Sequence, residues 1–242
     1  MIKNIDGAMA TGPAILLRRF YYFVFAVIIA VLVVGGFAPR LDEHLLHSPT
    51  PLPSILYVHA AVFMGWIILF MLQSALIAAE HVNLHRKVGM LGFVLGVTLA
   101  ITGVATVIVM AKFRDRHGHS DGASFLVLSL NDMLQYSIFF GLAIYWRKKS
   151  EFHRRLLFLA TCALTGPAFR RLMPNASPDQ WIYVGIDVLI LVGLAGDWLI
   201  NKRLHPVYLY GFPAALVGQW FAMYLHLSGS PAWLAIGHWL IR

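Results

Sequence analysis

Charged side chains are scarce in this sequence: Asp, Glu, Lys and Arg make up only 12% of its 242 residues, whereas hydrophobic residues make up 59%. Soluble domains carry about 25% charged residues, so this composition excludes an ordinary soluble domain and indicates a chain surrounded by lipid. Cysteine is almost absent, and the single Cys162 excludes an intrachain disulfide. We therefore expect an all-α fold, a polytopic transmembrane helical bundle.

Several motifs that carry chemistry are also missing. The chain has no phosphate-binding glycine loop, no lysine inside a hydrophobic run that would carry retinal and no Ser-His-Asp spacing. The clustered histidine motifs of membrane di-iron desaturases are absent as well. No convincing small-residue cleavage site accompanies the first hydrophobic run, 20–38, so we expect it to remain as the first span. The sequence indicates no particular class of enzyme.

Hydrophobic runs set the expected architecture. A helix needs about 20 apolar residues to cross the hydrocarbon core of a bilayer. Because the connections between the runs are short, we expect one transmembrane domain over 1–242. Trp233 and Trp239 in the tail 231–242 favour a short helix lying on the membrane interface. The seven expected spans are 20–38, 54–79, 88–111, 123–146, 155–173, 181–200 and 207–227.

The distribution of positive charge predicts an orientation. If the N-terminus lies inside, twelve of the nineteen Lys and Arg residues fall on the inner side. Cytoplasmic loops of membrane proteins are enriched in Lys and Arg. The sequence therefore predicts a bacterial inner-membrane protein with its N-terminus in the cytoplasm and its C-terminus outside.

The stretch "EFHRRLLFLATCALTGPAFRR" (151–171) predicts an unusually short span. Only fourteen residues separate its two arginine pairs. We expect it to cross the membrane because arginine stems can snorkel toward the interface. Pro167 removes a backbone donor and should kink the helix. Arg170 would then face the bundle interior and its carboxylates.

An outer layer of polar residues is expected at membrane depth. His59, Asp132, Arg170 and Asp187 fall at similar depths in different spans, and His226 lies near them. Ionisable residues within a membrane usually face the bundle interior and are functional candidates. One interpretation is structural, with ion pairs and hydrogen bonds that lock helices together. The other is a proton relay or a substrate site, and His59 alone is compatible with a haem or metal ligand.

An inner layer combines histidines with arginines at the starts of spans. Helix N-termini and arginines together attract anions, so this layer suits a phosphate, a quinone-type headgroup or the propionates of haem b. Lipid headgroups are the alternative. The candidate cofactor-binding residues are His85, Arg86, His153, Arg154 and His205.

A third candidate lies in the loop "RDRHGHSDG" (114–122). His117, His119 and Asp121 fall within five residues and offer ligands for a divalent metal. A solvated loop is the competing interpretation.

Four phrases in a fixed order carry a resemblance: "LHRKVGMLG", "NDMLQYS", "EFHRRLLFLAT...GPAFRR" and "RLHPVYLYG". Over about residues 55–215 the chain resembles a widespread family of uncharacterised bacterial multi-spanning membrane proteins. A looser likeness is to haem-b-type helical bundles, in which histidines clamp a haem. The family resemblance implies a polar signature of His59, His85, Arg86, Asp132, His153, Arg154, Arg170, Asp197 and His205.

Three functions remain open at this point. The leading hypothesis is a redox-type membrane protein that binds haem or quinone at the inner layer. The second is a proton-coupled transporter centred on Asp132, Arg170 and Asp187. The third is a structural or assembly factor whose polar residues only pair helices. In each case we expect the lipid bilayer as a partner, with quinone or another small molecule as the ligand in the first two and no nucleic acid.

Overall fold

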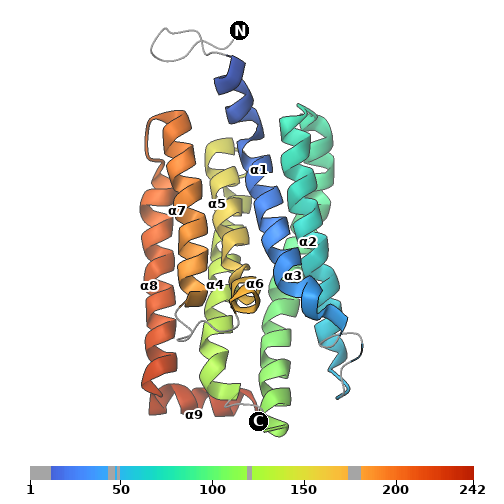
Figure 1. The fold of residues 1–242 in the computed structure, drawn as a ribbon, viewed down its shortest axis with the longest axis vertical. Coiled ribbons are helices and arrows are strands. Elements are labelled where there is room, and N and C mark those ends of the chain that lie inside the picture. Colours follow the sequence, from blue (N-terminus) through green and yellow to red (C-terminus); the bar gives the residue numbers. More distant parts are fainter. Residues whose placement is uncertain (1–11, 43–46, 48–49, 119–121, 174–180) are drawn as a thin grey trace.

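Helices make up nearly all of the computed structural model, which describes residues 12–42, 47, 50–118, 122–173 and 181–242 (Figure 1). Within these residues the chain forms a bundle of long helices without strands. The helices are α1 (Gly12–Phe37), α2 (Ser54–Ala78), α3 (Val82–Arg116), α4 (Gly122–Tyr145), α5 (Ser150–Ala163), α6 (Gly166–Leu172), α7 (Trp181–Asn201), α8 (Pro206–Ser228) and α9 (Pro231–Leu240), with a 3-10 turn at Ala38–Arg40.

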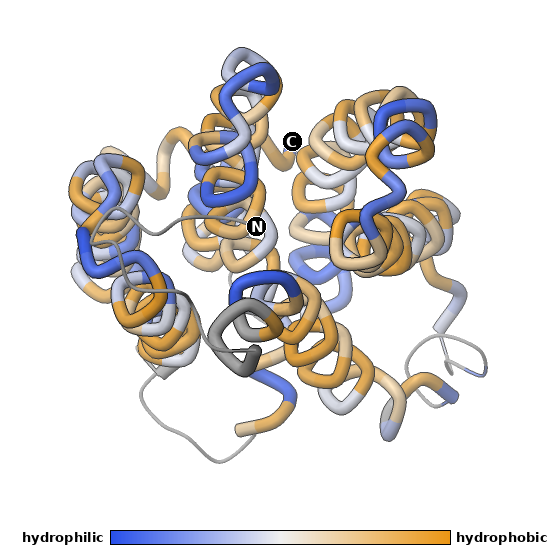
Figure 2. Tube along the Cα trace, turned by 90° about the horizontal axis from the view of Figure 1, so that it is seen from above, coloured by the Kyte–Doolittle hydropathy of each residue, from blue (hydrophilic) through white to orange (hydrophobic). Residues whose placement is uncertain are grey.

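Five of the described helices are long and apolar enough to cross a membrane: α1, α2, α3, α4 and α7. Their surfaces agree with a lipid environment, since side chains such as Met90 and Val31 are more than 60% exposed. Seen from above, most of the helical tube is hydrophobic, while hydrophilic stretches gather at the nearest turns (Figure 2). The prediction of a transmembrane helical bundle is confirmed at this level. The count of seven spans goes beyond it, because α8 and the α5–α6 segment are not among the five.

The expected span 155–173 is not one continuous helix. Helix α5 ends at Ala163, and α6 begins at Gly166 with Pro167 in its first turn. We expected Pro167 to kink a single helix; instead the helical hydrogen bonding stops before it, at Leu164 and Thr165. The Thr165 hydroxyl donates to the Cys162 carbonyl at 2.6 Å and so satisfies part of the broken end. Figure 1 shows α6 turned across the direction of α5.

The turns at the two ends of α8 follow from local chemistry. His205 caps its start, where the imidazole Nδ1 accepts a hydrogen bond from the Val207 N–H at 3.2 Å, and Pro206 occupies the first turn. Gly229 ends the helix with a positive φ of 56°, a conformation that glycine adopts without steric cost. Helix α9 then lies across the end of the bundle, as expected for the tail, and its Trp233 indole donates to the Ala123 carbonyl at 3.0 Å (Figure 1).

The helices pack mainly on their neighbours in the sequence. Helix α2 packs on α3, and α4 packs on both α3 and α5, while α1 contacts α2 and α6. The core lies between α1, α4, α5 and α7, where Phe158 and Leu159 of α5 are almost completely buried. We call the end of the bundle where α1, α3, α5 and α8 begin the N-terminal end (Figure 1). It holds the densest polar network of the described residues.

Candidate functional site at the N-terminal end

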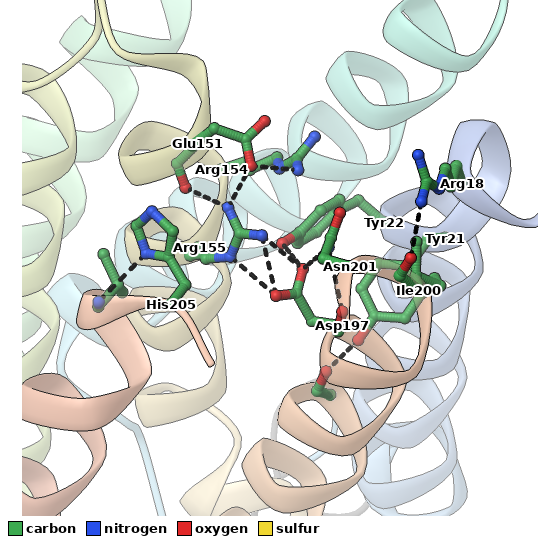
Figure 3. A network of polar contacts seen from close by, with 12 residues as sticks. Arg18, Tyr21, Tyr22, Glu151, Arg154, Arg155, Asp197, Ile200, Asn201 and His205 are labelled. Carbon is green, nitrogen blue, oxygen red and sulfur yellow. Dashed lines mark hydrogen bonds and ion pairs between the residues drawn. The ribbon is translucent and has the colours of Figure 1, made fainter. Parts of the chain in front are cut away.

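Arg155 of α5 lies at the centre of this network and is only 1% exposed (Figure 3). Each of its three guanidinium nitrogens donates to an acceptor here. Three hydrogen bonds go to the Asp197 carboxylate at 2.8–3.0 Å. The other two go to the Glu151 carbonyl at 2.8 Å and the Glu151 carboxylate at 2.7 Å. Each guanidinium nitrogen of Arg155 is thus paired within the protein.

Asp197 of α7 joins three helices. In addition to Arg155, it accepts hydrogen bonds from the Tyr22 hydroxyl of α1 at 3.2 Å and from the Asn201 amide at 3.2 Å. Asp197 itself is 2% exposed. Because a buried carboxylate is costly unless paired and hydrogen-bonded, these contacts fix the relative positions of α1, α5 and α7.

A cavity of about 210 Å³ lies beside this network. Arg154 contributes a guanidinium that donates to Glu151 at 2.6 Å and lies over the Tyr22 ring, 5.2 Å from its centroid. The Nε of Arg154 is buried and has no hydrogen-bond partner among the described residues. The cavity lining therefore combines guanidinium groups with carboxylate acceptors. Its lining consists of Arg18, Tyr21, Tyr22, Glu151, Arg154, Asp197, Ile200 and Asn201.

The charges around the cavity shift the pKa values of two residues that lie outside the hydrophobic spans, Glu151 and His205. Burial alone would raise the pKa of Glu151, but the hydrogen bond and charges of Arg155 and Arg154 outweigh it and hold the pKa below its ordinary value. Glu151 is therefore ionised at neutral pH. Burial and the positive charge of Arg155 lower the pKa of His205. Since neutral His205 accepts at Nδ1, its Nε2 carries the proton.

The candidate cofactor-binding residues are divided by the structure. Arg154 lines the cavity, and His205 lies beside the Arg155 network, packed edge-on against Phe152 (Figure 3). His85, Arg86 and His153 do not line the cavity. None of the three histidines lines the cavity, so nothing in the described structure supports a haem there.

His85 and His153 have their own local partners. The Nδ1 of His153 is 2.9 Å from the Ala143 carbonyl of α4. The Gln73 side chain, oriented so that both ends of its amide are satisfied, donates to His85 Nδ1 at 2.6 Å. Arg86 is exposed at the surface. His153 also acts electrostatically on His85, so the structure brings these two candidate residues near each other.

The expected outer layer is also divided. Arg170 is exposed and lies over the Phe125 ring at 4.1 Å, instead of facing the carboxylates as expected. Asp132 lies beside Tyr183 and Asn131, and Asp187 faces Gln219. Tyr183 interacts electrostatically with both carboxyl groups, so the structure brings this part of the layer together.

His59 stacks on Phe63 and packs near Gly103, and its Nδ1 is buried without a partner among the described residues. His226 interacts with Ser124 at 3.1 Å. Each histidine of the outer side thus has a different environment, and these contacts do not gather them into one site.

The loop proposed as a metal site is described only in part. His117 lies at the end of α3, with its Nδ1 2.8 Å from the Phe113 carbonyl, while His119 and Asp121 lie outside the described residues. Among the residues that the structure describes, no group of three or more His, Cys, Asp and Glu side chains is placed to hold a metal ion.

Sequence reasoning missed part of the network. Tyr22 and Asn201 were not singled out, and Arg155 was treated only as a flanking charge. A signal did exist: Glu151 and Arg155 are four residues apart, as are Asp197 and Asn201, so each pair shares one face of its helix. Such pairs of polar residues at the ends of two hydrophobic runs indicate helix faces that meet.

Comparisons with protein-family models, with curated proteins and with solved structures find no match to this chain. The function must therefore be argued from the geometry of the chain itself.

Proposed function

We propose that this chain is a bacterial inner-membrane protein that binds the headgroup of a quinone or quinol in the cavity beside Arg154. The observation that carries this proposal is the composition of the cavity lining, which offers both hydrogen-bond donors and acceptors at the end of an apolar bundle. This is a redox-type function, in which a lipid-soluble carrier reaches the protein from the bilayer.

The choice of headgroup follows from charge. A phosphate needs donors only, and in this cavity it would meet the carboxylates of Glu151 and Asp197, which repel it. A quinone carbonyl accepts hydrogen bonds and a quinol hydroxyl donates them. The Arg154 guanidinium suits the carbonyl, and the ionised Glu151 suits the hydroxyl. A neutral ring with both kinds of group fits this lining better than an anion does.

The size of the cavity supports a headgroup and not a whole cofactor. Sites that enclose drug-sized ligands measure about 300–1,000 Å³, and this cavity of about 210 Å³ is smaller. A tetrapyrrole ring therefore does not fit, and the lining contains no histidine that could bind its iron. One substituted benzoquinone ring is of suitable size, with its isoprenoid tail among the lipids.

The proposal includes an architecture of seven spans, with α5 and α6 together forming the fifth and α8 the seventh. The N-terminal end would face the cytoplasm, in agreement with its basic residues, and α9 would lie on the outer interface. Fusion of a reporter that is active only outside the cytoplasm to the C-terminus tests this orientation. An active cytoplasmic reporter at that position would contradict it.

Titration of the purified protein in mild detergent with a decyl-substituted benzoquinone tests the binding site, with quenching of tryptophan fluorescence as the signal. We expect Arg154→Leu to weaken binding by about 10–150-fold, because a hydrogen bond from a charged donor contributes about 1.5–3 kcal/mol. Arg86→Leu is the matched control, since Arg86 is a basic residue at the same end that does not line the cavity.

Three outcomes would contradict the proposal. In the first, the quinone does not bind the wild-type protein. In the second, both arginine variants bind it as well as the wild-type protein does. In the third, inorganic phosphate competes with the quinone for the site, which would identify an anion site instead.

A transport function is the second candidate, and one observation favours it. The break between α5 and α6 lies beside Asp132, since the Asp132 Oδ2 is 3.1 Å from the position that a Cβ on Gly166 would occupy. Discontinuous helices next to ionisable residues are a recurring feature of transporter substrate sites. Asp132→Asn should then abolish a substrate-dependent proton flux in liposomes while the protein still folds.

A further inference from the structure

A second group of polar side chains lies inside the bundle, between α4, α7 and α8. Asn131 donates to the Tyr183 hydroxyl at 3.1 Å, and Gln135 donates to Asn131 at 3.3 Å and to the Ala215 carbonyl of α8 at 3.2 Å. The Asp132 carboxyl lies beside the same Tyr183 hydroxyl. These residues connect α4 to α7 and to α8 through polar contacts at membrane depth.

One part of this group is not satisfied by protein contacts. Gln219 of α8 is only 3% exposed, yet neither its Oε1 nor its Nε2 has a hydrogen-bond partner among the described residues. The Oδ1 of Asp187 is buried as well and has no partner at hydrogen-bond geometry among the described residues, although the Gln219 amide of α8 lies near enough to interact with the Asp187 carboxyl group of α7. Buried polar groups of this kind are rarely left unpaired, because each costs free energy when it loses water.

The kinds of unpaired atom identify what is held there. Gln219 Nε2 is a donor, whereas Gln219 Oε1 and Asp187 Oδ1 are acceptors. A bare metal ion would satisfy only the oxygens. A water molecule both donates and accepts, and buried waters typically make two to four hydrogen bonds to such groups. The chemistry therefore matches internal water and not a cation.

The positions of the two carboxyl groups give this water a role. Tyr183 lies one helical turn before Asp187 on α7, and it interacts electrostatically with both Asp132 and Asp187. Among the ion pairs of the described residues, none involves either carboxyl group. Among the described residues, the titratable groups that interact with one another here are the two carboxyls and the tyrosine. Helix α8 faces them with the amide of Gln219, and α6 with Gly166.

We propose that Asp132, Tyr183, Asp187 and Gln219 form an internal-water site that passes protons between two intramembrane carboxyl groups. In the structure the Tyr183 hydroxyl donates to the Leu128 carbonyl at 3.4 Å. In the transfer it turns to the water beside Gln219 and releases that proton to it, while it takes the proton of the Asp132 carboxylic acid. The water passes a proton on to the Asp187 carboxylate. Hydroxyl and water are unchanged, and one proton has moved from one carboxyl to the other. This site is independent of the quinone cavity, which lies at the N-terminal end.

Reaction with dicyclohexylcarbodiimide tests the inference on the wild-type protein in liposomes. This apolar reagent adds to protonated carboxyl groups inside membranes, and mass spectrometry of the digested protein locates the adduct. We expect labelling of Asp187 that decreases as the pH rises, because proton exchange with water sets the amount of acid present. Asp197 is the internal control, since it is buried on the same helix but paired with Arg155, and it should remain unlabelled.

A pair of variants tests the role of the water. Gln219→Leu removes both polar partners at nearly constant size and should reduce the rate of Asp187 labelling several-fold. Gln73→Leu makes the same change on α2 and should leave the rate unaltered. The inference is overturned if wild-type Asp187 is unlabelled at every pH, if its labelling does not change with pH, or if only Asp132 reacts. Equal labelling rates in the two variants would remove the water from the proposal.

Discussion

The replacement Asp197→Asn probes the central ion pair of the N-terminal end. Three of the five hydrogen bonds from Arg155 go to Asp197, and both side chains are about 2% exposed. Removing one partner of a buried pair typically costs about 3–5 kcal/mol, because the remaining charge stays buried without compensation. Here Glu151 still pairs with Arg155, and the new amide keeps one acceptor oxygen. We therefore expect a loss of about 3 kcal/mol, the lower end of that range.

The assay is the free energy of unfolding in mixed micelles titrated with sodium dodecyl sulfate, followed by far-UV circular dichroism. The double variant Arg155→Leu/Asp197→Leu is the matched control, because it removes both charges and leaves neither unpaired. It should be less destabilised than Asp197→Asn, since apolar replacements of buried pairs are often neutral. A loss below about 1 kcal/mol in Asp197→Asn would refute the assignment of this pair as a desolvated contact that holds α5 to α7.

Two further predictions concern packing and pH. A Cβ on Gly36 would lie 2.8 Å from the Ala168 carbonyl oxygen, a backbone atom that cannot move easily, so Gly36→Ala should lower thermal stability by about 1–3 kcal/mol. Gly141→Ala is its control, since nothing lies within 4 Å of the added atom; an equal loss in both would contradict the steric argument. Because the pKa of Glu151 is lowered on folding, its contribution to stability is present above the ordinary glutamate pKa and is lost as the pH falls through the folded value. Melting temperatures measured from pH 6 down to about 3 should therefore fall less steeply in Glu151→Gln than in wild type, and parallel curves would refute this role.

The helical bundle could be predicted from the sequence because lipid leaves the backbone few alternatives. Without water, every buried N–H and C=O needs a partner within the chain, so long apolar runs form helices. The predicted ends of such runs are also close to the observed helix ends: α2 covers Ser54–Ala78, where 54–79 was expected. The break at Leu164 and Thr165 was harder to locate, since the sequence shows that Pro167 disturbs a helix but not on which side the hydrogen bonds stop.

In the candidate site, the depth of a residue in the membrane does not determine its role. Arg154 and Arg155 are neighbours with the same chemistry, yet one lines the cavity and the other is fully paired inside the core. Adjacent residues point about 100° apart around a helix, so their roles depend on which face packs against α7. The expected layers placed residues by height only, and height does not tell which side of a helix a residue lies on.

The partner of Arg155 is 42 residues further along the chain, which has a consequence for synthesis. The arginine leaves the ribosome well before Asp197 does, and α5, about 21 Å long at 1.5 Å per residue, is shorter than the ~30 Å hydrocarbon layer. During that interval this segment cannot settle alone in the bilayer. We expect it to wait among the lipid headgroups or against the translocon, and to enter only together with α7.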